Sequence, residues 1–167
     1  MTQTAAVSMT AALVAAALLA APGVAHADLV VPQLDAPCSE NLGGALTQLP
    51  DGKTYLECNN SSGRYQWSEF TSPYPSSDRW FTYGPAVKLH GQGLRNPQIL
   101  SGKWTAYPQE AGTLCAADQA SVVSAGEVGP TQTSTGEPGE PLALEVLPVV
   151  FSITLSGNCL WEAAPAA

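Results

Sequence analysis

Aromatic side chains concentrate in one short stretch of the chain, where charged and hydroxyl residues separate them. Seven of the twelve aromatic residues lie between positions 65 and 83. Aromatic faces can stack on sugar rings, and neighbouring polar groups can fix the ring hydroxyls. The loop from Tyr74 to Trp80 is the best candidate, because its proline would reduce the entropy lost on binding. The sequence therefore predicts a carbohydrate-binding site formed by Tyr74, Asp78, Arg79 and Trp80.

The same aromatic residues have a structural interpretation, which is the favoured one. A small domain needs large apolar side chains for its core, and aromatic rings supply the greatest buried area per residue. Tyr74 is the expected exception, because it lies between Pro73 and Pro75 in a loop. Whether this stretch is core or binding surface stays open at this point.

Catalytic chemistry finds little support in the motifs. Export would remove His26, which leaves His90 as the one histidine for any hydroxyl–histidine or thiol–histidine arrangement. No Gly-x-Ser-x-Gly elbow is present, and the Gly-x-Gly at 91–93 lacks the third glycine of a phosphate-binding loop. With fourteen acidic residues, some carboxylate pair is nearly inevitable. We therefore expect a non-enzymatic protein without a cofactor, and a small secreted hydrolase using His90 or an acidic pair is the alternative.

The four cysteines are more suited to disulfides than to metal binding. They are Cys38, Cys58, Cys115 and Cys159, an even number in a chain that begins with an export signal. None lies within the short spacing typical of zinc sites, so no metal is expected. Three pairings are possible. We favour Cys38–Cys58 with Cys115–Cys159, because each bond then closes one half of the chain.

The charge distribution opposes nucleic-acid binding. The chain carries a formal net charge of −8, and an acidic exported protein is a poor partner for phosphate backbones. All six basic residues lie between positions 53 and 103. This segment is either partly neutralised by the acidic remainder after folding or forms a face for an anionic partner; the first interpretation is favoured.

Residues 1–27 are typical of a cleaved signal peptide. An apolar run at 11–21 is followed by Pro22-Gly23 and then by Ala25-His26-Ala27, whose small residues suit a signal peptidase. The run is too short to span a bilayer. The first cysteine is Cys38, so a lipid anchor at the cleavage point is not expected. We predict cleavage before Asp28 and secretion, although no Lys or Arg precedes the apolar run.

The remaining chain predicts one β-rich domain. Residues 28–37 form an extended N-terminal segment, 38–162 a single β domain and 163–167 a flexible tail. Short strands separated by Gly and Pro turns are typical of a sandwich, with a small barrel as the alternative. The expected strands are 46–49 and 53–58 around the hairpin turn 50–52, then 64–70, 80–83, 86–90, 98–107, a strand around 122–123, two strands within 142–155, and the last strand at 151–161. Loops are expected at 71–79 and 126–141.

The last strand has the clearest pattern. Its apolar residues occupy odd positions and its polar residues even ones, which is the period of a half-buried strand. The inward face is expected to carry Phe151, Ile153, Leu155, Cys159 and Trp161.

Several strings of the chain resemble those of small secreted proteins of mycobacteria and related actinobacteria. They are TSPYPSSDRWFTYGPAVKLHGQGLRNPQ, LSGKWTAYPQ, Cys115 and FSITLSGNCLW. The resemblance implies export to the cell envelope or the medium and bridged cysteines, and it implies no activity. The resemblance leaves the function open, and from the residues above we expect a monomeric domain that binds a ligand at the envelope or outside the cell. In the alternative, the domain binds envelope carbohydrate through the loop from Tyr74 to Trp80.

Overall fold

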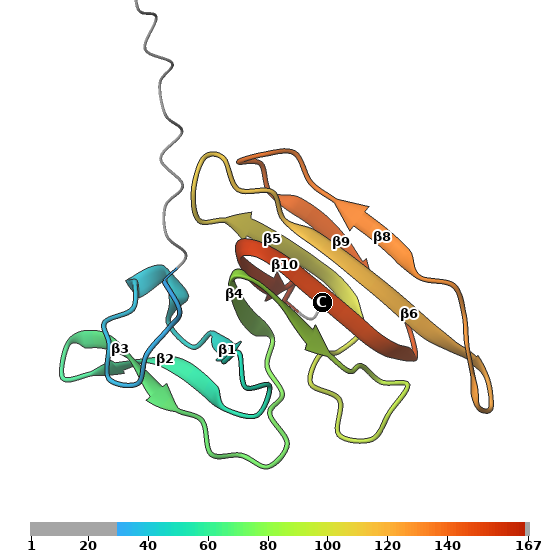
Figure 1. Cartoon of the computed structure of the whole chain (residues 1–167), viewed down its shortest axis with the longest axis horizontal. Helices are drawn as coiled ribbons and strands as arrows, with labels where there is room; N and C mark the ends of the chain where they lie inside the picture. Colours follow the sequence, from blue (N-terminus) through green and yellow to red (C-terminus); the bar gives the residue numbers. More distant parts are fainter. Residues whose placement is uncertain (1–29, 166–167) are drawn as a thin grey trace, which may run out of the picture.

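A computed structural model describes residues 30–165 of the 167-residue chain (Figure 1). The predicted signal peptide and the last two residues lie outside this range. The prediction of a mainly β protein is confirmed, and no α-helix occurs within the described residues. The elements are η1 (Glu40–Leu42), β1 (Leu46–Gln48), β2 (Tyr55–Ser61), β3 (Arg64–Glu69), β4 (Arg79–Leu89), β5 (Gly102–Pro108), β6 (Ala116–Ser124), β7 (Glu127–Val128), β8 (Gln132–Thr135), β9 (Leu142–Val146) and β10 (Val150–Ala163).

The strands form one open mixed sheet with β10 at its centre (Figure 1). Its main path runs β3-β2-β1-β4-β10-β5-β9, and β6 branches from β10 and carries β7 and β8. One edge of β10 pairs with β4, whereas its other edge pairs first with β6 and then with β5. The β1–β4 contact is parallel, and the other strand pairs are antiparallel.

The alternation predicted for the last strand is present with one exception. Ile153, Leu155, Cys159 and Trp161 are all fully buried. Phe151 was expected on the same inward face, and that prediction is wrong, because the side chain is 37% exposed. The register between β10 and β6 shifts between Val150 and Ser152, so Val150 takes the buried position instead.

Two hydrophobic clusters pack on opposite faces of β4 and β10. The larger includes Trp80 and Trp161, together with residues from β5, β6 and β9. The smaller includes Phe81 and Leu160 and is completed by residues 42–67. We call residues 30–70 the N-terminal lobe and strands β4–β10 the main sheet; Figure 1 shows β1–β3 of the lobe beside the main sheet, to which they connect through the pairing of β1 with β4. Successive residues of β4 and β10 thus point to opposite faces, so that each strand contributes to both the larger and the smaller cluster.

Strand β4 is continuous where two short strands were expected. Gly84-Pro85 was predicted to end the first of them, but β4 runs through both residues. The pairing with β10 goes from Gly84–Gly157 to Val87–Leu155, so Pro85 and Ala86 together face one residue, Ser156. This is a β-bulge, in which a proline without an N–H group is tolerated.

Three other boundaries differ from the predictions. The strand expected at 98–107 begins only at Gly102, because the backbone N–H groups of Gln98 and Ile99 bond to the His90 carbonyl in a loop. The loop expected at 126–141 contains β7 and β8, and both of these strands pair with β6. Strand β10 extends to Ala163, the first residue of the expected tail.

The structure contains the two disulfides favoured from the sequence, Cys38–Cys58 and Cys115–Cys159. The first joins Cys38, just before η1, to β2 inside the N-terminal lobe. The second joins the chain just before β6 to β10 in the main core. Within residues 30–165, no helix is long and apolar enough to cross a membrane.

Candidate functional site

The predicted binding loop does not present its aromatic residues together. Trp80 is completely buried, so its proposed role in stacking on a ligand is wrong. It lies in β4 and faces the main core, where its ring meets Tyr55 edge to face at a centroid distance of 6.2 Å. Its indole N–H donates to the Gln98 carbonyl at 3.3 Å. The alternation of β4 explains this placement, because Arg79 and Phe81 project to the opposite face.

Tyr74 is 62% exposed, as expected for the loop between two prolines. Its backbone N–H bonds to the Ser72 hydroxyl at 3.2 Å, so the segment is held by local contacts. It does not line the hollows described below, which Asp78 and Arg79 do line. Tyr74 therefore shares neither hollow with Asp78 and Arg79.

The registers of β4, β10 and β5 place Asp78 and Arg79 beside residues that are distant in sequence. Glu162 of β10 pairs with Arg79 of β4 at one edge of its strand and with Thr105 of β5 at the other edge. The next row on the same face consists of Phe81, Leu160 and Tyr107. The N-terminal lobe buries Phe81 and Leu160 but leaves Tyr107 41% exposed. The uncovered end of this face is the candidate site.

Two open hollows meet at this end of the sheet. One has a volume of about 470 Å³ and the other about 360 Å³, and Arg79, Tyr107 and Glu162 line both. Asn41 and Gln109 line only the first hollow, and Asp78 only the second. We call these six residues together the Arg79–Tyr107 groove. It combines one exposed aromatic ring with two amides, two carboxylates and one guanidinium group.

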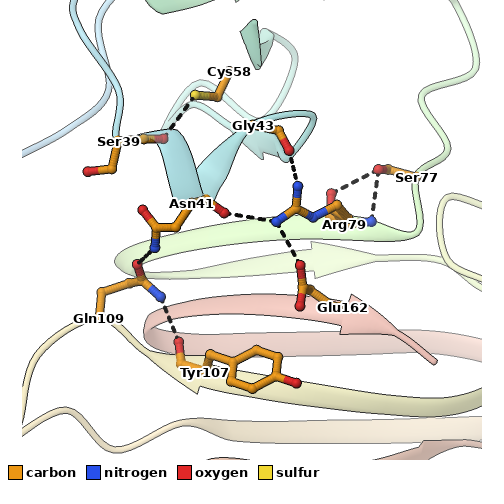
Figure 2. Close-up of polar contacts among 9 residues, drawn as sticks. All are labelled: Ser39, Asn41, Gly43, Cys58, Ser77, Arg79, Tyr107, Gln109 and Glu162. Atoms are coloured by element: carbon orange, nitrogen blue, oxygen red, sulfur yellow. Dashed lines mark hydrogen bonds and ion pairs between the residues drawn. The ribbon is translucent and has the colours of Figure 1, made fainter. Parts of the chain in front are cut away.

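Arg79, at the start of β4, links the N-terminal lobe to β10 beside the groove. Figure 2 shows its guanidinium group donating to the carbonyls of Gly43 and Asn41 in the N-terminal lobe, the latter at 2.8 Å. The same group pairs with the Glu162 carboxylate of β10 at 2.6 Å. The Nε atom of Arg79 is buried and has no partner among the described residues. Much of the charge of Arg79 is thus already matched within the protein.

The two amides close the first hollow. The Asn41 amide donates to Gln109 Oε1 at 2.8 Å, and Gln109 Nε2 donates to the Tyr107 carbonyl at 2.9 Å (Figure 2). Asn41 belongs to η1, so this chain of bonds ties the N-terminal lobe to the end of β5. Within residues 30–165, Asn41 Oδ1, Glu162 Oε2 and the Tyr107 hydroxyl have no hydrogen-bond partner. These atoms are available to a ligand.

Within residues 30–165, the His90 ring has no carboxylate or hydroxyl group as a hydrogen-bond partner. Its Nε2 lies 2.8 Å from the Asn96 carbonyl oxygen, its one side-chain partner among the described residues. A carbonyl oxygen only accepts hydrogen bonds, so Nε2 carries the proton and donates it. No group of three or more His, Cys, Asp or Glu side chains within residues 30–165 is placed to hold a metal ion.

Two side chains near the β1–β2 hairpin, those of Asp51 and Tyr83, have shifted pKa values. At the hairpin turn between β1 and β2, hydrogen bonds lower the pKa of Asp51 from 3.8 to about 2. The Thr54 hydroxyl contributes most, followed by the backbone N–H groups of Thr54 and Lys53. Burial raises the pKa of Tyr83, and the Asp51 charge adds to the effect. Asp51 accordingly acts as a turn-stabilising residue.

Sequence reasoning identified Asp78 and Arg79 but missed Asn41, Tyr107, Gln109 and Glu162. One signal for Tyr107 was present: it follows the buried Trp104 and Ala106 by an odd number of positions, so it belongs to the outer face of its strand. The others come together only through the strand registers. No family model, no curated protein and no solved structure matches the chain.

Proposed function

We propose that the protein is a secreted, non-enzymatic domain that binds a ligand at the cell envelope or outside the cell, and that its ligand site is the Arg79–Tyr107 groove. The observation that carries this proposal is the exposed residue Tyr107 between two adjoining hollows that several polar side chains line. Ligand sites typically combine an apolar contact surface with a few fixed polar groups, and both are present in the groove.

The disulfides support an oxidising location. Bonds of this kind persist mainly in exported proteins, because cytosolic thiols are kept reduced. The protein has two such bonds and no free cysteine among its described residues. Together with the pattern of residues 1–27, this supports export and cleavage before Asp28. The protein recovered from the medium of an expressing actinobacterium should then begin at Asp28, as measured by intact mass and N-terminal sequencing. Recovery of the uncleaved chain from the membrane fraction would contradict this part of the proposal.

The architecture proposed with this function is the sandwich predicted from the sequence. The large cluster combines residues of β4 and β10 with Trp104 of β5 and Leu144 of β9, which supports a sheet that folds over its own core. A small barrel is the alternative, and a monomer is the proposed state. A crystal structure would distinguish the two architectures, and light scattering would measure the mass.

Cosedimentation with isolated cell-envelope particles tests the proposed site. The wild-type protein and Tyr107→Ala are compared with Tyr74→Ala, which removes another exposed tyrosine outside the groove. We expect the wild type and Tyr74→Ala to sediment with the particles, and Tyr107→Ala to stay in solution. Equal behaviour of all three proteins would refute the groove as the site.

The hydrolase alternative has its own measurement. Asp78 and Glu162 line one hollow, and a carboxylate pair is the minimum that glycoside hydrolysis requires. The proposal of a non-enzymatic domain predicts no release of reducing sugar from envelope polysaccharide during long incubation. Release that Glu162→Gln abolishes would establish an enzyme instead.

A further inference from the structure

We infer that the groove selects an uncharged oligosaccharide, which crosses the ring of Tyr107 and excludes acidic glycans. This inference rests on the proposed function, because it names the ligand class of the same site. It rests on three features of the groove: the position of the ring, the charge of the side chains, and the hydrogen-bonding atoms that remain free.

Tyr107 lies where the two hollows meet. It lines both of them, and its row on the sheet continues into Leu160, which the N-terminal lobe covers. The ring is therefore supported from one side and exposed on the other. Apolar faces of sugar rings pack against such a surface, while the sugar hydroxyls remain available at its edges. Because hollows lie at both sides of the ring, the groove suits a chain of sugars better than a single one.

The charge of the groove is unfavourable for anions. Arg79 is its single basic residue, and its guanidinium group is already paired with Glu162 and with two backbone carbonyls. The Asp78 carboxylate has no side-chain partner among the described residues. Two carboxylates and one guanidinium leave one net negative charge, so a uronate or sulfate in the groove would be repelled.

The free atoms favour hydroxyl groups over ammonium groups. Glu162 Oε2, Asn41 Oδ1 and the Asp78 carboxylate accept hydrogen bonds, which both a hydroxyl and an ammonium can supply. The amides of Asn41 and Gln109 each use one N–H within the protein, so each retains a second N–H. An ammonium has no lone pair to accept those donors, whereas a hydroxyl can both donate and accept. A neutral polyhydroxyl ligand therefore matches all the free groups.

The inference is tested with three oligosaccharides that share one type of backbone linkage and differ in charge. The probes are cellotetraose, which is neutral, its tetraglucuronate counterpart, which is anionic, and the non-acetylated glucosamine tetramer, which is cationic. All three share a β-1,4 linkage. A glycan array of neutral, uronic and amino oligosaccharides with other linkages extends the same comparison. The proteins are the wild type, Tyr107→Ala, Tyr107→Phe, Asp78→Asn and the control Tyr74→Ala, each checked for unchanged thermal unfolding.

The expected result is binding confined to neutral oligosaccharides. Tyr107→Ala should weaken it by about tenfold or more, as for other central aromatic contacts. Tyr107→Phe should retain most of the binding, because the ring rather than its hydroxyl makes the main contact, and Tyr74→Ala should bind like the wild type. Asp78→Asn should weaken neutral binding and also raise the relative binding of uronates, because it removes one negative charge. A purely structural role of Asp78 would not change that ratio.

The other outcomes separate this inference from the proposed function. Preference for acidic or amino glycans with the same dependence on Tyr107 would overturn the ligand class and leave the groove as the site. Envelope binding that needs Tyr107, without any glycan binding, would do the same. Glycan binding lost in Tyr74→Ala and retained in Tyr107→Ala would favour the loop predicted from the sequence, and it would overturn both proposals. The absence of any binding would also overturn both.

Discussion

The two disulfides close rings of different size, and this difference predicts their relative contributions to stability. The cysteines are 20 residues apart in Cys38–Cys58 and 44 apart in Cys115–Cys159. A cross-link restricts the unfolded chain, and in the chain-entropy model its effect grows with the logarithm of the ring size. That model gives about 3 kcal/mol for the smaller ring and about 4 kcal/mol for the larger one at 25 °C. Either value is a large part of the ~5–15 kcal/mol that stabilises an ordinary domain.

The difference can be measured by urea unfolding of two double variants, each of which lacks both cysteines of one disulfide. Replacing Cys115 and Cys159 by alanine should lower the free energy of unfolding by ~0.7 kcal/mol more than replacing Cys38 and Cys58. Cavities act in the same direction, because both cysteines of the larger ring are fully buried and Cys38 is only partly so. Alanine avoids placing an unpaired hydroxyl in the core. An equal or greater loss from the smaller ring would refute the ring-size argument.

The location of each ring gives a second readout. Cys38–Cys58 lies wholly within the N-terminal lobe, so its loss should accelerate amide hydrogen exchange in β2 and β3 more than in β10. Loss of Cys115–Cys159 should accelerate exchange in β6 and β10 instead. Uniform acceleration in both variants would show that the lobe and the main sheet open only together.

Three further predictions concern the core, the bulge and the hairpin turn. Trp80→Ala should cost about 3–5 kcal/mol in thermal or urea unfolding and Tyr74→Ala less than ~0.5 kcal/mol; similar losses would contradict the burial of Trp80. Gly157→Ala should cost more than ~2 kcal/mol, because φ is +97° and a Cβ would meet the Leu114 carbonyl; a neutral result would refute this geometry. By NMR titration, Asp51 should ionise at about 2, so the turn loses its stabilising contribution as the pH falls from about 4 through about 2. Thr54→Val should move the Asp51 pKa back toward 3.8, and an unshifted wild-type value would contradict the hydrogen bonds of the turn.

Much of the fold follows from periodicity and turn chemistry. The period of two in residues 151–161 predicted the buried face of β10, and Asp51-Gly52 predicted the β1–β2 hairpin. The errors arise where tertiary pairing overrides a local signal. Pro85 would end an isolated strand, yet a bulge opposite Ser156 absorbs it. Residues 132–135 have the composition of a loop, but β6 offers them an unpaired edge.

The candidate site was harder to predict for a geometric reason. Asp78 and Arg79 stood out because they flank an aromatic cluster, but Glu162 is placed beside them only by the register of β4 against β10. Likewise, Asn41 and Gln109 are 68 positions apart and meet through the packing of η1 on the sheet. Such contacts depend on the whole topology and cannot be found from spacing along the chain. The alternation of polar and apolar residues that buries Trp80 becomes visible in the sequence only when the strand is taken to begin at Arg79 rather than at Trp80.

The central position of β10 has a consequence for the order in which the protein can fold. Residues 150–163 complete the pairing of β4, β5 and β6, and they follow all of those strands in the chain. A chain that emerges with its N-terminus first therefore presents three strands with an unoccupied edge until these last residues arrive. The N-terminal hairpins can form early, because their contacts are local, whereas the main sheet must wait. During that interval the unpaired edges are open to association with other chains, and closure of Cys115–Cys159 marks its end.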